Sequence, residues 1–107
     1  MLIYHNKQCH ELKVNPAYYI PLACGFKTFE VRVDDRGFKV GDYLWLREHD
    51  AVSGSGYSGR DLVKEVTYIL KGGEVASLEP GVVVMAIVNP WPIEVAEIKA
   101  LFAREAL

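Results

Sequence analysis

The stretch GFKTFEVRVDDRGFKVGDYLWLREH, residues 25–49, decides the predicted fold because it contains two alternating segments separated by turn residues. Within residues 26–33, apolar side chains alternate with polar ones, which is the two-residue period of a β-strand. One face carries Phe29, Val31 and Val33, and the opposite face carries Thr28, Glu30 and Arg32. Residues 43–49 alternate again after Gly41 and Asp42, which are typical turn residues. Consecutive strands of this kind predict an antiparallel sheet.

The residues before this stretch predict one more strand and a short helix. Residues 10–14 alternate as a strand does. Asn15 suits a helix N-cap, and Pro16 suits the first helical position, where a missing N–H group leaves no hydrogen bond unmade. Pro21 removes a hydrogen bond inside the same helix, so we expect that helix to be kinked or very short.

The second half of the chain predicts two further strands and a C-terminal helix. Residues 60–70 are rich in β-branched and aromatic side chains, as in a long strand, and residues 53–59 form a Ser/Gly-rich hairpin loop that could close over a ligand. Residues 81–88 are apolar on both faces, which predicts a strand covered on both sides. Residues 93–107 have the period of an amphipathic helix. Its apolar stripe consists of Val95, Ile98, Leu101 and Phe102.

The order strand, helix, four strands, helix predicts an α+β fold in a single domain over residues 1–107. Because most strands are consecutive, we expect a small, mostly antiparallel β-barrel with a short helix after the first strand and a helix at the C-terminus.

Composition limits the class of protein and of partner. The 107 residues carry a net charge of −2, so no global positive field attracts a polyanion. The charge is uneven, because residues 1–47 carry a net +2 and the remainder carries −4. No signal peptide is recognisable, and the longest apolar run, Val82–Val88, is far shorter than the roughly 20 residues that cross a bilayer. We therefore expect a cytoplasmic protein without a membrane partner.

Several segments together resemble a known family. They are His10–Lys13, Gly25–Arg32, Asp34–Asp42, Leu46–Glu48, Tyr57–Arg60, Val66–Leu70 and Val83–Met85. Over residues 10–88 the chain resembles a phage and bacterial domain of unknown function that is described as an ASCH-related RNA-binding domain. The C-terminal helix, residues 93–107, lies outside the resemblance.

The resemblance implies a PUA-like fold in which a cleft beside the first helix holds RNA or a nucleotide. One branch of the wider superfamily is a small amidohydrolase that removes an acetyl group from acetylated cytidine with a Lys, a Thr and a Glu. Lys27 matches that Lys by position. The Thr would come three residues later, where this chain has Glu30, and this departure argues against the same hydrolysis while leaving other reactions open.

The strongest candidate site residues are Lys27, Thr28, Glu30 and Arg32. Glu30 and Arg32 share one face of their strand, and Lys27 stands at its entrance, so an acceptor lies beside two cationic donors. Such a set suits a nucleobase edge and a phosphate, since Arg binds bidentately and Glu accepts from an amino group. A partly buried Glu30 could also act as a general base. The alternative is a solvated ion pair that contributes at most ~1 kcal/mol.

Three other residues are predicted to contact the ligand: Tyr19, Trp45 and His10. Trp45 belongs to a stripe of aromatic and basic side chains on residues 43–49, which suits stacking on unpaired bases. The same stripe could instead be core beneath a helix. His10 could be an acid or base in the cleft, or it could hydrogen-bond a neighbouring backbone group.

No cofactor or metal site is predicted. His5, Cys9, His10 and Cys24 lie near the N-terminus, but their spacing matches no zinc pattern. The sequence also contains no P-loop, dinucleotide fingerprint or nucleophile elbow.

These observations favour a module that binds RNA or a nucleotide through Lys27, Glu30 and Arg32, with Tyr19 and Trp45 stacking on bases. One alternative is a small hydrolase of a modified nucleoside in which Lys27 and Glu30 are catalytic. Another is a phage or bacterial accessory protein that binds a host protein through the cleft or the C-terminal helix. Whether the chain is an enzyme stays open, with binding alone favoured.

Overall fold

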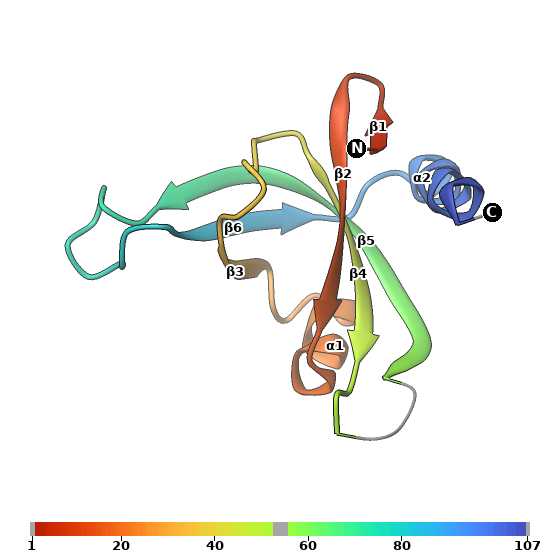
Figure 1. Ribbon diagram of the computed structural model, residues 1–107, viewed down its shortest axis with the longest axis horizontal. Coiled ribbons are helices and arrows are strands. Elements are labelled where there is room, and N and C mark those ends of the chain that lie inside the picture. Colours follow the sequence, from red (N-terminus) through yellow and green to blue (C-terminus); the bar gives the residue numbers. More distant parts are fainter. Residues whose placement is uncertain (1, 53–55, 107) are drawn as a thin grey trace.

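The computed structural model describes residues 2–52 and 56–106, which form six strands and two helices (Figure 1). In chain order they are β1 (Leu2–Tyr4), β2 (Lys7–Val14), α1 (Pro16–Ala23), β3 (Phe29–Val33), β4 (Tyr43–His49), β5 (Tyr57–Lys71), β6 (Val82–Val88) and α2 (Pro92–Glu105). Every predicted strand and helix is present. The three-residue β1 was not predicted, and it pairs with β2 through a tight turn at His5 and Asn6, both at positive φ.

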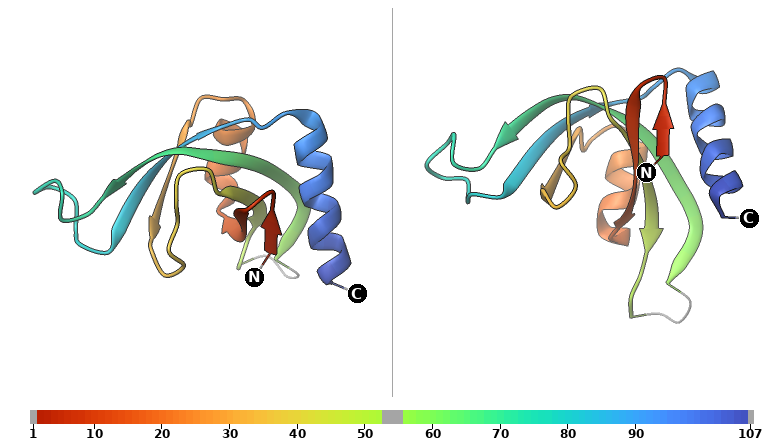
Figure 2. Two further views of the ribbon diagram at one scale, coloured as in Figure 1. Left: turned by 90° about the horizontal axis from the view of Figure 1, so that it is seen from above. Right: turned by 45° about the horizontal axis from the view of Figure 1, so that its top comes forward.

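The strands form one open sheet in the order β1-β2-β4-β5-β6-β3. All neighbouring strands are antiparallel except β2 and β4, which run parallel. The α+β class and the mostly antiparallel sheet are therefore confirmed. The predicted β-barrel is wrong, because the sheet is open: β1 and β3 are its two edges and do not pair with each other. The sheet is strongly curved, and β5 arches across the molecule in both views of Figure 2.

Two apolar clusters lie on opposite faces of the sheet. The cluster on the inner face includes Leu44 and Leu46 of β4, Leu22 of α1 and Phe38 from the loop after β3. The cluster on the outer face contains Tyr43 of β4 together with buried side chains of α2. The alternation predicted for β4 is confirmed, since its even-numbered leucines and its odd-numbered aromatics enter different clusters.

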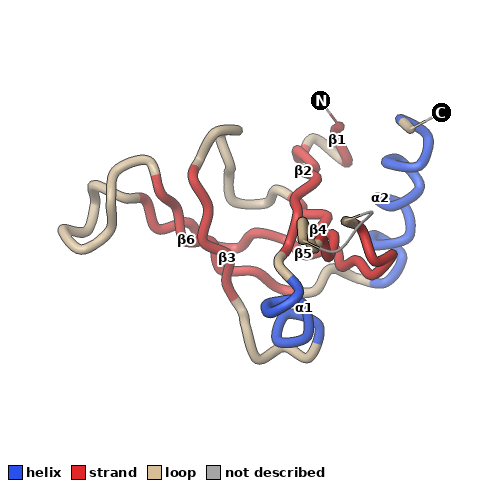
Figure 3. The backbone as a smooth tube through the Cα atoms, turned by 60° about the horizontal axis from the view of Figure 1, so that its bottom comes forward, coloured by secondary structure: helices blue, strands red, loops and turns tan. Residues whose placement is uncertain are grey.

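Both helices follow the predicted boundaries closely. The side chain of Asn15 caps α1 by accepting from the Ala17 N–H at 2.9 Å, and Pro16 begins the helix. With Pro21 inside it, α1 is only eight residues long, as expected. It packs near the ends of β2 and β4, whereas α2 lies apart from it (Figure 3). In α2, Ile98 and Phe102 are buried, and Val95 and Leu101 pack against the same cluster.

Two expectations about coverage need correction. The strand β6 is not covered on both sides, because α2 contacts β1 and β5 and leaves the outer face of β6 open, where Val88 is exposed. The apolar face of β3, including Val31 and Val33, is also exposed on that side.

In the predicted loop at 53–59, residues 53–55 lie outside the described residues and Tyr57 already belongs to β5. Among the described residues, no helix is long and apolar enough to cross a membrane.

Candidate ligand pocket

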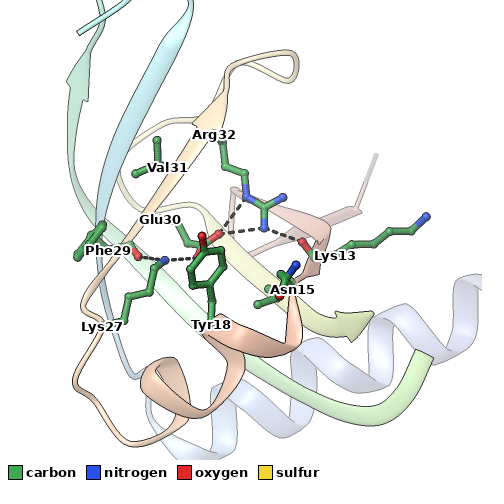
Figure 4. A pocket seen from close by; sticks show the side chains of 9 residues that line it. Lys13, Asn15, Tyr18, Lys27, Phe29, Glu30, Val31 and Arg32 are labelled. Carbon is green, nitrogen blue, oxygen red and sulfur yellow. Dashed lines mark hydrogen bonds and ion pairs between the residues drawn. The ribbon is translucent and has the colours of Figure 1, made fainter. Parts of the chain in front are cut away.

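A pocket of about 480 Å³ lies between β3 and the junction of β2 with α1 (Figure 4). Its lining residues are Lys13, Val14, Asn15, Tyr18, Lys27, Phe29, Glu30, Val31 and Arg32. The volume is in the range of small-molecule sites, roughly 300–1,000 Å³. The polar face of β3 therefore borders a concavity instead of open solvent.

Glu30 is the centre of the charge network in this pocket. Its side chain is 5% exposed, and its Oε1 accepts from Lys27 Nζ at 2.8 Å. Its Oε2 accepts from Arg32 Nε at 2.9 Å and lies 2.9 Å from Arg32 Nη2. A buried carboxylate is stable only when it is paired and hydrogen-bonded, and here each oxygen has a cationic donor. One carboxylate thus fixes the position of two cations.

Each cation has a second anchor. Lys27 Nζ donates to the Phe29 carbonyl at 2.7 Å and lies 5.2 Å from the Tyr18 ring centroid and 4.8 Å from that of Phe29. Arg32 Nη2 donates to the Lys13 carbonyl at 2.7 Å. The side chains of Lys27 and Arg32 remain 16% and 25% exposed, so a ligand can reach them. With Glu30 between them, the three residues leave a net charge of +1.

The rim of the pocket adds aromatic and neutral polar groups. The Tyr18 ring is 54% exposed and stands beside the network, as Figure 4 shows. Asn15 uses its side-chain oxygen to cap α1, so its amide nitrogen is left to donate. A cationic floor beside an exposed ring suits a flat ligand that carries acceptor oxygens or negative charge.

Tyr19 and Trp45 do not reach this pocket. The Trp45 indole packs on Phe102 of α2 at 4.6 Å, and its Nε1 donates to Asp61 Oδ2 at 2.7 Å. Tyr19 is buried, and its hydroxyl donates to the Asp61 carbonyl at 3.1 Å. For Trp45 the structure matches the alternative reading, in which a helix covers the stripe.

His10 and Thr28 also lie outside the pocket lining. The buried His10 pairs through Nε2 with Asp42 Oδ2 at 2.8 Å, and Asp42 also accepts from the Lys39 N–H at 3.0 Å. His10 therefore hydrogen-bonds a side chain, and this pair anchors the turn before β4. Thr28 is exposed, and its carbonyl accepts from the Ile87 N–H at 3.1 Å, which fixes the entrance to β3.

Tyr18, Asn15 and Lys13 line the pocket although sequence reasoning did not select them as ligand contacts. The tyrosines at 18 and 19 are neighbours on a helix, so they point about 100° apart and only one can face the pocket. Leu22 of the same helix is buried in the inner cluster, and in this orientation of α1 it is Tyr18 that lines the pocket. No local signal in the sequence distinguishes the two.

Neither a metal cluster nor a disulfide bond is seen among the described residues. No group of three or more His, Cys, Asp and Glu side chains in residues 2–52 and 56–106 could hold a metal ion. Both cysteines are free thiols, with Cys9 buried and Cys24 exposed.

One family model matches residues 9–87, which is most of the chain. Its description is "Domain of unknown function (DUF3850)". The chain belongs to this family. No curated protein matches it. The DUF3850 region runs from Cys9 in β2 to Ile87 in β6 and contains every residue that lines the pocket, whereas β1 and α2 lie outside it. The pocket is thus built within the DUF3850 domain itself.

Proposed function

We propose that the protein is an RNA- or nucleotide-binding module of the ASCH/PUA-like kind, with the pocket around Glu30 as its binding site. The observation that carries this proposal is the buried carboxylate of Glu30, which holds the cations of Lys27 and Arg32 side by side beneath the exposed Tyr18 ring. A nucleotide has the matching parts, since its phosphate and carbonyl oxygens accept from cations and its base stacks on an aromatic ring.

Each residue then has a defined role. Lys27 and Arg32 bind phosphate or carbonyl oxygens of the ligand. Glu30 orients these two cations, and the free capacity of its Oε1 can accept from a base amino group. Tyr18 supplies the stacking surface in place of Trp45 and Tyr19. The modest local charge suits a small ligand or a short single strand better than a long duplex.

The test is a binding titration with nucleotides and short single-stranded RNA at two salt concentrations. We expect Lys27→Ala and Arg32→Ala each to weaken binding about 10- to 100-fold, because each removes a charge-assisted hydrogen bond of roughly 1.5–3 kcal/mol. Lys71→Ala is the matched control, since Lys71 is an exposed residue that does not line the pocket. No binding to any nucleotide or RNA, or equal binding by all three variants, refutes the proposal.

The two alternatives have weaker support from the geometry. A hydrolase would use Lys27 and Glu30, but these groups are paired with each other and no activated nucleophile stands beside them among the described residues. A host-protein contact through the stripe of Ile98 and Phe102 is blocked, because that stripe packs on the sheet. Turnover of acylated nucleosides by the wild type, lost in Glu30→Ala, would favour the hydrolase instead.

A further inference from the structure

A second pocket, of about 370 Å³, adjoins the first at the start of α1. Asn15 lines the first pocket, and the next residue, Pro16, lines the second. The remaining lining residues of the second pocket are Glu48, Asp50, Gly56, Tyr57, Ser58 and Arg60. The two pockets therefore share the corner where β2 passes into α1.

Lys13 connects the two pockets. Its backbone carbonyl accepts from Arg32 Nη2 in the first pocket, while its Nζ lies 6.0 Å from the centroid of the Tyr57 ring, which lines the second. Figure 4 shows the Lys13 side chain extending away from the first pocket. Within the described part of the chain Lys13 has no ion-pair partner, so its positive charge between the two pockets is available to an anion.

The Tyr57 ring is held in place and yet partly open. The guanidinium of Arg47 lies 3.8 Å from its centroid, and the His49 ring meets it edge-on at 4.8 Å. Arg47 is itself fixed by an ion pair with Glu11 at 2.7 Å. Tyr57 nevertheless stays 36% exposed. A ring that is oriented before a ligand arrives loses little conformational freedom on binding.

The charges of the second pocket favour a base over a phosphate there. Arg60 donates to both carboxylate oxygens of Glu48, at 3.0 and 2.7 Å, and so neutralises that buried acid. Asp50 adds a further carboxylate to the lining. A phosphate would be repelled by Asp50, whereas a base can stack on Tyr57 and donate its amino group to a carboxylate.

We propose that the ligand is a single-stranded RNA of at least two nucleotides: one nucleotide occupies the pocket at Glu30, the linking phosphate binds Lys13, and the next base stacks on Tyr57. This inference rests on the proposed function and specifies its ligand class. It also gives a reason for two neighbouring pockets joined by Lys13, a cation that has no ion-pair partner among residues 2–52 and 56–106.

The test compares UMP and AMP with the dinucleotides r(UU) and r(AA) by calorimetry on the full chain. We expect each dinucleotide to bind about 5- to 150-fold more tightly than its mononucleotide, because one base stacked on an aromatic ring contributes roughly that factor. Tyr57→Ala should remove this gain and leave mononucleotide affinity unchanged, while Tyr57→Phe should keep it. Tyr68→Ala, which changes an exposed tyrosine elsewhere on β5, is the matched control.

The outcomes separate this inference from the proposed function. If mononucleotides bind and dinucleotides bind no more tightly, the second subsite is refuted and the first pocket keeps its function. A gain that persists in Tyr57→Ala also refutes the subsite. If neither class of ligand binds, the proposed function itself fails. If Tyr57→Ala does not fold, NMR chemical shifts of the wild-type protein test the subsite instead. The Tyr57 signals must then shift when r(UU) is added and stay unchanged when UMP is added.

Discussion

Replacing Glu30 with Gln tests whether this carboxylate organises the pocket. The substitution keeps the size of the side chain but offers one acceptor oxygen and an NH₂ group that faces a cationic donor. Breaking a fully buried ion pair costs about 3–5 kcal/mol. Lys27 and Arg32 are 16% and 25% exposed, so water can partly replace the lost partner. We therefore expect Glu30→Gln to lower the free energy of unfolding by about 2–3 kcal/mol.

The assay is urea unfolding at pH 7, followed by tryptophan fluorescence, which changes when Trp45 leaves its contact with α2. A chain of this size has an m-value of roughly 1–3 kcal/mol per molar urea, so the midpoint should fall by about 0.7–3 M. Glu11→Gln is the control, because Glu11 pairs with Arg47 and its side chain is 42% exposed. For that exposed pair we expect a loss of at most ~1 kcal/mol.

The reasoning fails if the two variants have the same midpoint within error. In that case the Glu30 carboxylate does not determine the positions of Lys27 and Arg32, and the main support for the binding site is lost. A selective loss of stability in Glu30→Gln that comes with unchanged nucleotide affinity would instead confine Glu30 to a structural role.

Three further predictions concern the rest of the molecule. At pH 8, iodoacetamide should label Cys24 and spare Cys9, because Cys24 is exposed and burial raises the pKa of Cys9 to about 11; equal labelling by mass spectrometry would contradict this. Burial lowers the pKa of Lys64 below its ordinary value of 10.5. Between the pKa of Lys64 in the folded protein and this ordinary value, the unfolded chain binds more protons than the folded chain, so the free energy of unfolding should rise with pH in that range. Lys64→Met should remove this dependence, and urea midpoints that change with pH as in the wild type would contradict the assignment. Deleting residues 92–107 should expose the cluster around Tyr43 and Val63 and make the protein insoluble; a soluble product with the circular dichroism of a folded sheet would show that α2 is dispensable.

The regular part of the fold could be predicted from the sequence because its signals are local. The alternation of residues 43–49 gave both the strand and the two faces that β4 presents to the clusters. Asn15 and Pro16 marked the start of α1 through capping chemistry that involves only adjacent residues. The three-residue β1 was too short for a period to be recognised.

The arrangement of the candidate site depended on contacts that no local pattern contains. Glu30 and Arg32 were predicted to bind a ligand from one face of their strand, and the structure places both in the lining of a pocket. The aromatic partner could not be predicted, because the docking of α1 selects Tyr18 over Tyr19. Trp45 looked like a stacking residue in a stripe of aromatics, but only the path of α2 shows that it is covered.

The open edges of the sheet explain why the pocket exists. Curvature brings β3 back towards β2, and two arginines bridge the gap: Arg32 Nη2 donates to the Lys13 carbonyl at 2.7 Å and Arg36 Nη1 to the Glu11 carbonyl at 2.8 Å. In a closed barrel, backbone N–H groups of β3 would occupy such carbonyls, and the strands would lie only about 4.8 Å apart. That spacing leaves no room for a ligand. Because long cationic side chains join the edges instead, the strands stand further apart and the gap becomes a pocket with a positive wall. The same geometry accounts for the burial of Glu30, since its carboxylate pairs with Arg32, one of the two arginines that span the gap.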